Sequence, residues 1–236
     1  MKGNKPLITI VFLSGLLVLF FAIYVKRLEK QANMSEQVNS MTQQGNIAEP
    51  AKTPQAVSAL DHIKGNKEAT VTVIEYSDFQ CTECKTIQPT IDKIMQVYGK
   101  KIRFVTRFLP LPQHENTAKE SEAAECAGEI GGENAYWKYS RSLFDNSTAI
   151  STGIGLPMTK LTPLAVSLGL DINKFNACIN GGKFSSRVEA QKADGNSIGI
   201  HLLPSMVVID SQNNPKMIVG NQPYEVYKLV LDMALL

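Results

Sequence analysis

Two neighbouring cysteines, Cys81 and Cys84, are the side chains in this sequence best suited to carry out chemistry. They lie in the run C-T-E-C, which follows a β-branched segment and begins an expected helix. At the start of a helix, unpaired backbone N–H groups and the helix dipole stabilise an anion, so we expect Cys81 to be a thiolate nucleophile with a lowered pKa. Cys84, one turn further on, can resolve a mixed disulfide formed at Cys81. The pair therefore predicts thiol-disulfide exchange.

Metal binding is the alternative interpretation of the same pair. Half of a zinc site has the C-x-x-C spacing, and sulfur ligands also suit Cu(I), so a non-catalytic copper-binding module stays open. A zinc site needs two further ligands, but the sequence contains no second C-x-x-C and no His-x3-His pair among its histidines, which are His62, His114 and His201. We therefore expect redox chemistry that needs neither a metal ion nor a cofactor.

Glu75 precedes Cys81 by six residues and lies in a strand that we expect to be buried. A carboxylate at the exposed end of a strand is one interpretation of this residue. We favour a buried acid beneath the start of the helix, because its neighbours Val73 and Ile74 leave little polar surface. Desolvation raises the pKa of such an acid, which can then take the proton from Cys84 when that thiol attacks.

Pro204 begins a later strand, where a first-residue proline is an ordinary feature. If its peptide bond is cis and it faces Cys81, it leaves the backbone of Leu203 free to pair with a bound polypeptide. The same placement obstructs metal binding by the cysteine pair. Pro204 is therefore a candidate member of the site.

The segment around the cysteines has the pattern of a strand, a helix and a second strand. Residues 69–76 are β-branched and mostly apolar, which is typical of a buried central strand. Apolar residues then recur at helical spacing over residues 81–98, and Gly99 ends the helix. Residues 102–108 alternate like a second strand. A crossover helix between two strands predicts that they run parallel in one sheet.

The remainder of the domain returns to sheet only near its end. Residues from about 116 to 199 are largely helical by pattern, and Asp171 is expected to cap one of these helices. Residues 205–210 and 216–219 flank a turn signal and predict a hairpin. An amphipathic helix over residues 225–236 is expected to close the domain.

The first part of the chain differs in composition. The whole chain has a net charge of +2, but residues 1–30 hold five basic groups and one acid, so the remainder is slightly negative and offers no broad face for nucleic acid. Residues 7–25 form 19 uncharged positions, which as a helix span about 28 Å, close to a bilayer core. We expect residues 1–25 to be an uncleaved membrane anchor, with a cleaved signal peptide as the alternative. Residues 26–57 are polar and predict a flexible linker.

From about residue 60 to 236 the sequence resembles the DsbA-like thiol-disulfide oxidoreductases of the thioredoxin superfamily. The matching motifs include D-H-I-K-G-N at residues 61–66, V-I-E-Y-S-D-F-Q-C-T-E-C at 73–84, R-F-L-P-L-P-Q-H at 107–114 and L-P-S-M-V-V-I-D at 203–210. The resemblance implies a thioredoxin-like α/β fold over residues 58–236, with a helical domain inserted at about 114–199.

The resemblance also implies a role for each candidate residue. Cys81 becomes the nucleophile, Cys84 the resolving cysteine, Glu75 the buried acid and Pro204 a cis-proline. It further implies that the remaining two cysteines form a structural disulfide, Cys126–Cys178, whereas the residues alone also allow two buried free thiols.

Three residues depart from the family pattern. Thr82 and Glu83 stand where family members commonly have proline with histidine or an aromatic residue. A carboxylate beside Cys81 should disfavour the thiolate and make the protein a weaker oxidant. Leu203 stands where threonine or valine often precedes the cis-proline. We expect these three residues to modulate the pair, and they leave open whether it oxidises substrates or reduces and isomerises them.

A structural disulfide persists only in an oxidising compartment. We therefore expect a monomeric enzyme in the bacterial cytoplasmic membrane, spanning it once, with the catalytic domain on the periplasmic or extracytoplasmic side. The expected partners are exported or secreted polypeptides with cysteines, a membrane quinone-linked thiol oxidase that reoxidises the pair, and membrane lipid around the anchor.

Overall fold

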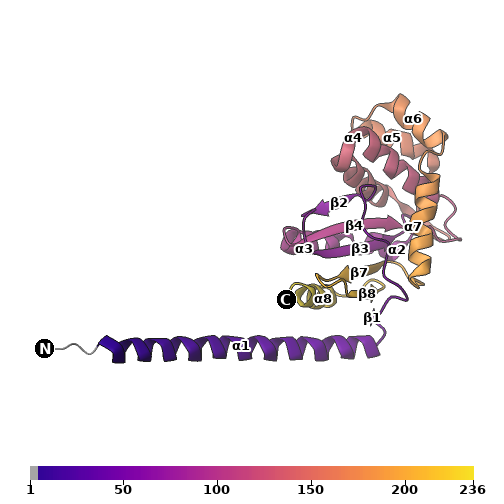
Figure 1. The fold of residues 1–236 in the computed structure, drawn as a ribbon. Coiled ribbons are helices and arrows are strands. Elements are labelled where there is room, and N and C mark those ends of the chain that lie inside the picture. The colour runs from indigo at the N-terminus through magenta and orange to yellow at the C-terminus, as the bar shows by residue number, and fades with distance from the viewer. Residues whose placement is uncertain (1–4) are drawn as a thin grey trace. The chain divides into compact units, whose positions relative to one another are not determined.

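The structure is a computed structural model that describes the backbone of residues 5–236 and the side chains from Leu17 onward (Figure 1). The chain divides into two units, and the boundary falls between Gln44 and Gly45. Each unit is described by itself below.

The first unit is one long helix, α1 (Lys5–Gln43). Its described apolar side chains are largely exposed, with Leu17 69% and Phe21 67% accessible. From Leu17 onward, no helix combines the length and the apolar character that crossing a bilayer requires. The predicted anchor at residues 1–25 begins before that range, and its side chains at residues 1–16 lie outside the described ones.

The expectation of a flexible linker at residues 26–57 is wrong, because α1 continues to Gln43. Residues 26–43 contain neither glycine nor proline, and their lysine, glutamate, glutamine and methionine residues are good helix formers. A polar composition alone does not prevent a helix. The rest of the expected linker belongs to the second unit, where strand β1 (Ile47–Ala48) pairs with the sheet.

The second unit is built on a six-stranded sheet in the order β1-β8-β7-β3-β4-β2. At its centre, β3 (Val71–Ser77) and β4 (Ile102–Phe108) run parallel, as the strand-helix-strand pattern predicts. On the other side of β3 lie the antiparallel strands β7 (Ser205–Ile209) and β8 (Pro215–Val219), which form the predicted hairpin. The edge strand β2 (Ile63–Gly65) pairs with β4. Every residue of β3 is buried, so this strand is the core of the sheet.

Three helices accompany the sheet closely. The expected single helix over residues 81–98 is instead two helices, α2 (Thr82–Thr86) and α3 (Gln88–Tyr98), which meet at Ile87. Pro89 explains the break, because proline fits the first turn of a new helix but not a helix interior. The closing helix α8 (Tyr224–Ala234) is joined to α3 by a 2.8 Å hydrogen bond from Tyr98 to Asp232.

A largely helical insertion separates β4 from β7 and gathers beyond one end of the sheet (Figure 1). Its helices are α4 (Thr117–Asn146), α5 (Leu161–Ser167), α6 (Ile172–Asn180) and α7 (Ser185–Ser197), with a short 3-10 helix at Met158–Lys160. As predicted, Asp171 caps α6, and its side chain accepts two backbone N–H groups.

The insertion also contains a small hairpin that the helical pattern did not predict. Strands β5 (Thr148–Ile150) and β6 (Gly153–Gly155) pair with each other just after α4. The glycine-containing run T-A-I-S-T-G-I-G explains this departure, because glycine disfavours a helix interior and permits a tight turn.

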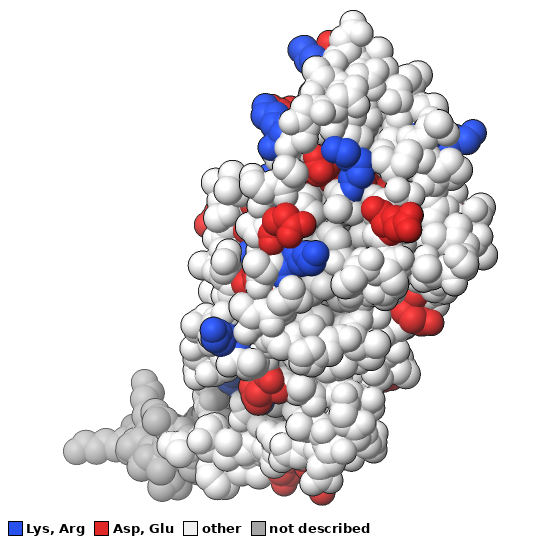
Figure 2. All heavy atoms as spheres, turned by 90° about the vertical axis from the view of Figure 1, so that its right-hand side faces the viewer, with Lys and Arg blue, Asp and Glu red and all other residues white. Residues whose placement is uncertain are grey.

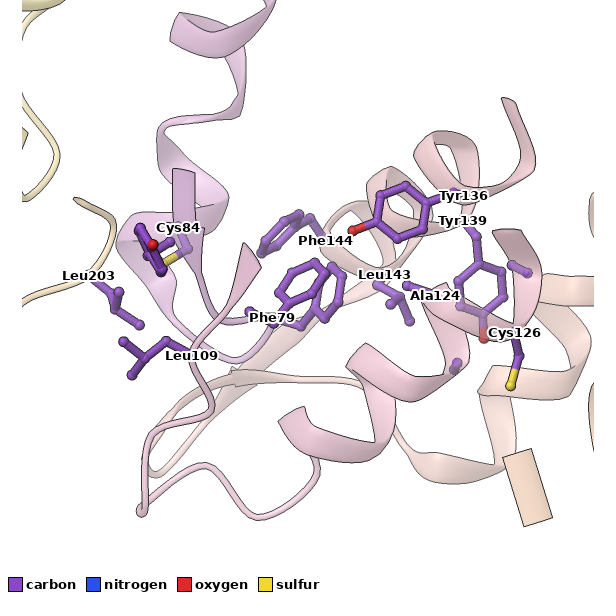
Figure 3. Packing of buried hydrophobic residues seen from close by; sticks show 14 of the residues in the cluster. Phe79, Cys84, Leu109, Ala124, Cys126, Tyr136, Tyr139, Leu143, Phe144 and Leu203 are labelled. Carbon is purple, nitrogen blue, oxygen red and sulfur yellow. The ribbon is translucent and has the colours of Figure 1, made fainter. Parts of the chain in front are cut away.

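A disulfide joins Cys126 of α4 to Cys178 of α6. One continuous apolar core links this bond to the sheet. Figure 3 shows Cys84 at one end of the drawn cluster and Cys126 at the other, with aromatic rings between them. Phe79 packs against Phe108 at a ring-centroid distance of 4.2 Å. The segment that carries the cysteine pair is thus packed against the same core as the insertion.

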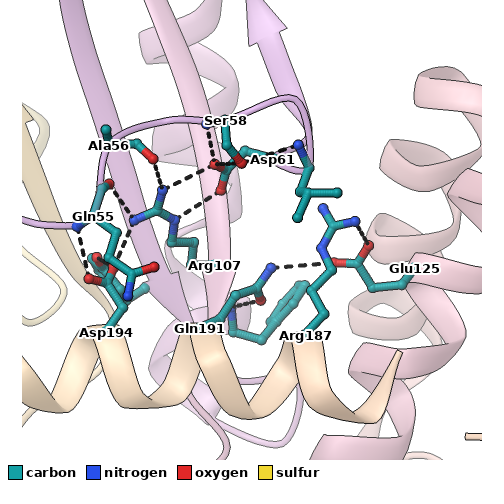
Figure 4. A network of polar contacts seen from close by, with 12 residues as sticks. Gln55, Ala56, Ser58, Asp61, Arg107, Glu125, Arg187, Gln191 and Asp194 are labelled. Carbon is teal, nitrogen blue, oxygen red and sulfur yellow. Dashed lines mark hydrogen bonds and ion pairs between the residues drawn. The ribbon is translucent and has the colours of Figure 1, made fainter. Parts of the chain in front are cut away.

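A buried arginine fastens the segment before β2 to the sheet (Figure 4). Arg107 of β4 forms ion pairs with Asp61 at 2.9 Å and with Asp194 of α7 at 2.7 Å. It also donates to the carbonyl of Gln55 at 2.9 Å. One side chain therefore holds together three parts of the chain that are distant in sequence.

Candidate active site

The nucleophile candidate, Cys81, lies at the amino end of α2, immediately after the turn that follows β3. It is the N-cap residue of that helix, with extended backbone angles. Its Sγ accepts the backbone N–H of Cys84 at 3.3 Å. Cys81 is partly exposed and Cys84 is fully buried behind it. An incoming polypeptide can therefore reach Cys81 but not Cys84.

The two thiols, which are both free in this structure, differ in acidity. The pKa of Cys81 is lowered, first by its contact with the Cys84 thiol and further by the Cys84 backbone N–H, while burial and the Asp78 carboxylate oppose this change. The pKa of Cys84 is raised well above its usual value, mainly by burial and then by its contact with Cys81. Cys81 is therefore suited to act as a thiolate and leaving group, and Cys84 as a protonated thiol.

The loop before β7 approaches the same sulfur. The Leu203–Pro204 peptide bond is cis. The carbonyl oxygen of Leu203 lies 3.8 Å from Cys81 Sγ. Leu203 itself is buried, whereas its neighbour Leu202 is 56% exposed. The structure thus brings the Cys81–Cys84 pair together with Leu203 and Pro204, which follow it in the sequence by more than a hundred residues.

Glu75 is a buried acid on β3, with 2% of its surface exposed. Its Oε2 accepts the Thr106 hydroxyl at 3.0 Å, and its Oε1 has no hydrogen-bond partner among the described residues. Burial is the main cause that raises its pKa to about 7. The Glu75 charge in turn contributes to the raised pKa of Cys84. A carboxyl group with this pKa can accept or donate a proton near neutral pH.

A small cavity of about 40 Å³ lies beside Glu75. Tyr136 and Ser140 are among the residues that line it, and neither hydroxyl group has a hydrogen-bond partner among the described residues. At its edge are Asp92 and Arg141, which form an ion pair. A polar cavity of this size has room for water, so the Glu75 carboxyl need not be isolated from solvent protons.

The two residues between the cysteines are exposed on α2. The Glu83 carboxylate accepts a hydrogen bond from Asn221 Nδ2 at 2.9 Å, which connects α2 to the loop after β8. Thr82 uses its carbonyl to accept the Thr86 hydroxyl at 3.0 Å. Asn221 was not predicted as a site residue, and no pattern in its own segment indicates this contact.

Sequence reasoning also missed a buried polar group around the turn before Cys81. Asp78, Gln80 and Glu120 are each at most 1% exposed, and His114 is 6% exposed. The available signal was position, because Asp78 and Gln80 directly precede Cys81. The contacts of His114 and Glu120 depend on the fold and have no counterpart in local spacing.

The surface on one side of the molecule has mixed charge. Basic and acidic side chains are interspersed over the face in Figure 2. Among the described residues, no three histidine, cysteine, aspartate or glutamate side chains gather closely enough to hold a metal ion.

A comparison with protein families identifies the family to which the domain belongs. A family model described as Thioredoxin matches residues 58–231, most of the chain. The chain therefore belongs to the thioredoxin family, and its fold is that of the DsbA-family thiol-disulfide oxidoreductases.

The chain matches solved structures with this fold over nearly the whole length of those structures. The chain superposes on Pseudomonas aeruginosa DsbA2 with a TM-score of 0.62 and 23% identity, covering 75% of this chain and 96% of that one. For BdbD from Bacillus subtilis in its oxidised form, the TM-score is 0.62 at 18% identity, covering 79% and 97%. For alpha-DsbA1 from Wolbachia pipientis it is 0.62 at 20% identity, covering 77% and 94%.

Curated relatives are much longer proteins. The chain is 30% identical over 162 residues to a Na(+)/H(+) antiporter NhaA of Herminiimonas arsenicoxydans, covering 69% of this chain but 24% of the relative. It is 32% identical over 135 residues to the Na(+)/H(+) antiporter NhaA 3 of Salinispora tropica, covering 57% of this chain and 19% of the relative. The chain thus spans about a quarter or less of the length of these relatives.

Proposed function

We propose that this chain is a protein thiol-disulfide oxidoreductase that introduces disulfides into exported proteins through the Cys81–Cys84 pair. The observation that carries this proposal is the asymmetry of the pair. One sulfur is accessible, lies at a helix start and has a lowered pKa, and the other is buried with a raised pKa. Thiol-disulfide exchange needs this division between a leaving thiolate and a protected resolving thiol.

The oxidising cycle begins with the Cys81–Cys84 disulfide. A substrate thiolate attacks Cys81 Sγ, the bond between the two cysteines breaks, and its electron pair stays on Cys84. Cys84 then takes a proton, for which the buried carboxyl of Glu75 is the suited donor. A second substrate thiolate attacks the substrate sulfur of the mixed disulfide and expels Cys81 as a thiolate. The substrate is oxidised by two electrons, and the enzyme leaves the cycle as the dithiol.

The direction of electron flow depends on how well the protein stabilises the Cys81 thiolate. The Cys84 N–H favours the thiolate, and the Asp78 carboxylate opposes it. Glu83 beside it adds a further exposed carboxylate. A weaker thiolate makes a weaker oxidant, so a reductase or isomerase that uses the same pair from the dithiol is the alternative. An oxidase also needs reoxidation, and we propose a membrane quinone-linked thiol oxidase for that step.

We further propose that residues 1–25 anchor a monomeric enzyme in the bacterial cytoplasmic membrane, with residues 58–236 on the extracytoplasmic side. Three observations support this placement. Residues 7–25 are uncharged. The Cys126–Cys178 disulfide suits an oxidising compartment. The curated relatives are named as antiporters, a class of proteins that exchange ions across membranes, so a related domain occurs there in a membrane protein.

The reduction potential of the Cys81–Cys84 pair in the full-length protein tests the direction. A potential near that of strongly oxidising members of the superfamily, about −120 mV, would support the disulfide donor. A value near that of thioredoxin, about −270 mV, would refute the oxidase and favour the reductase or isomerase.

Two variants test the roles of the cysteines. With Cys81 first converted to a mixed disulfide with a small activating thiol, Cys84→Ser should exchange that thiol for a thiolate of a reduced substrate polypeptide and accumulate the resulting mixed disulfide, whereas Cys81→Ser should form none and should abolish dithiol oxidation. If Cys84→Ser traps no substrate, Cys81 is not the nucleophile.

A further inference from the structure

A buried carboxylate, Asp78, lies between the end of β3 and the nucleophilic cysteine. Its side chain is fully buried. Its Oδ1 accepts the Gln80 N–H at 2.7 Å, and its Oδ2 accepts the Leu111 N–H at 2.9 Å. Its backbone carbonyl accepts the Cys81 N–H at 3.1 Å. Two backbone donors favour the ionised carboxylate, so Asp78 shapes the turn that presents Cys81 and also sets a negative charge near its sulfur.

His114 lies against this carboxylate and is itself almost fully buried. Its Nε2 is 3.0 Å from the carbonyl oxygen of Thr152, which can only accept a hydrogen bond, so this nitrogen carries a proton. Its Nδ1 is 2.9 Å from Asp78 Oδ2, as an ion pair without hydrogen-bond geometry. With a proton on Nδ1 as well, the imidazolium would place a positive charge against the Asp78 carboxylate.

The same histidine connects the turn before Cys81 to the β5–β6 hairpin. Thr152, its carbonyl partner, lies in the turn of that hairpin, and Ile154 N–H donates to the carbonyl of Gln80 at 3.0 Å. A Cβ on Gly153 would lie 2.4 Å from the Gln80 oxygen, and its φ of 151° also favours glycine. The hairpin is thus held directly against the residue that precedes Cys81.

Glu120 of α4 completes the group. Gln80 Nε2 donates to Glu120 Oε1 at 3.4 Å, and Oε2 has no hydrogen-bond partner among the described residues. Burial is the main cause that raises the pKa of Glu120 to about 7, so it is partly protonated at neutral pH. Asp78 therefore contributes the negative charge that most needs a counterion at this turn, and His114 is in contact with it.

We propose that His114 acts in its protonated form as a positioning residue for the exchange reaction, because its positive charge then balances Asp78 and keeps the Cys81 thiolate available. The role rests on the proposed thiol-disulfide function. His114 does not touch the reacting sulfurs. It acts through Asp78, whose carbonyl and carboxylate hold the turn and whose charge opposes a thiolate at Cys81. Without the imidazolium, that charge is uncompensated in a buried site, where electrostatic effects are strong.

A merely structural role for the pair makes a different prediction. If Asp78 and His114 only hold the loop and hairpin in place, their removal lowers stability without a specific effect on the acidity of Cys81. The rate at which iodoacetamide alkylates Cys81 in the reduced full-length protein separates the two roles, because it follows the thiolate fraction. Peptide mass spectrometry assigns the alkylated cysteine.

Three variants form the test. His114→Gln leaves the Asp78 charge uncompensated, and we expect alkylation at pH 6 to slow about tenfold. Asp78→Asn with His114→Gln removes both charges but also one acceptor of the turn, so it should alkylate faster than His114→Gln without needing to reach the wild-type rate. His62→Gln is the matched control, because His62 also lies between two acceptors, Glu125 at 3.0 Å and Glu133 at 2.9 Å, but belongs to a different cluster. Its alkylation rate should not change.

The outcomes are decisive in each direction. A folded His114→Gln variant that alkylates at the wild-type rate overturns the proposal. A folded double variant that alkylates no faster than His114→Gln overturns it equally, and if His114→Gln does not fold, His114→Asn takes its place in the same comparison. The assay needs no substrate protein or redox partner, so the proposal can hold even if the chain oxidises nothing. Equal alkylation of Cys81 and Cys84 in the wild type would instead contradict the proposed function.

Discussion

Replacing Glu75 by glutamine should make the domain more stable at alkaline pH and leave it nearly unchanged under acid. Glu75 is buried, and its pKa is raised to about 7 from a reference value of 4.5. The folded state therefore holds the proton more tightly than the unfolded chain does. The stability that this protonated carboxyl contributes is fully present below pH 4.5 and is lost as the pH rises through 7. Glutamine keeps the shape and hydrogen-bonding capacity without ever ionising.

The size of the effect follows from that difference in pKa. One pKa unit corresponds to about 1.4 kcal/mol, so the change from 4.5 to about 7 corresponds to about 3 kcal/mol of unfolding free energy. The wild type should lose this amount between pH 4 and pH 8 relative to Glu75→Gln. Thr106→Val removes the hydroxyl that lowers the Glu75 pKa, so it should make the pH dependence of stability steeper.

Urea unfolding at several pH values measures this difference. The Cys81–Cys84 pair is kept reduced, and mass spectrometry checks that the Cys126–Cys178 disulfide stays intact. The exposed Glu68, changed to glutamine, is a control that removes a carboxylate from the surface. A stability difference between the wild type and Glu75→Gln that stays constant from pH 4 to pH 8 would refute the reasoning, because a buried acid with a raised pKa cannot give a constant difference.

Three further changes test the fold and the pair. Changing both Cys126 and Cys178 to alanine should cost about 4 kcal/mol in urea unfolding, because the bond closes a loop of 52 residues, and the Cys81–Cys84 potential should stay the same. Arg107→Met leaves Asp61 and Asp194 buried without their partner, and a loss of about 3 to 5 kcal/mol is expected; no loss of thermal stability would show that the network is dispensable. Glu83→His should lower the Cys81 pKa and make the pair more oxidising. Asn221→Ala is the control that removes only the contact between Asn221 and Glu83. An unchanged or more reducing potential in Glu83→His would contradict the electrostatic role of Glu83.

The central strands and the cysteine pair were predictable because their signals are local. The predicted runs at residues 69–76 and 102–108 correspond to the strands Val71–Ser77 and Ile102–Phe108, which are buried except at the partly exposed Arg103, and such runs keep their pattern wherever they pair. The position of Cys81 at a helix start could likewise be inferred from the strand before it and the helical spacing after it. These inferences need only neighbouring residues.

The features that could not be predicted from the sequence depend on long-range contacts. Residues 47–48 pair with β8 because the sheet offers a free edge there, and a run of only two residues carries no strand pattern that could predict this. The partners of Arg107 come from two separate segments, residues 55–61 and α7, and those of His114 also come from two. In the α1 segment the error was different, because polar composition was taken to mean flexibility although no residue from 26 to 43 breaks a helix.

Two carboxyl groups three residues apart serve the two cysteines differently, and their surroundings explain why. Burial raises the pKa of Glu75 to about 7, so it binds a proton near neutral pH and is suited to exchange it with Cys84. Asp78 accepts two backbone N–H groups and lies against His114, so it acts on Cys81 through the turn. An ionised Glu75 also raises the pKa of Cys84, so the two groups favour sharing one proton over losing both. Proton transfer therefore involves the buried Cys84, whereas the charge balance around Asp78 affects the accessible Cys81.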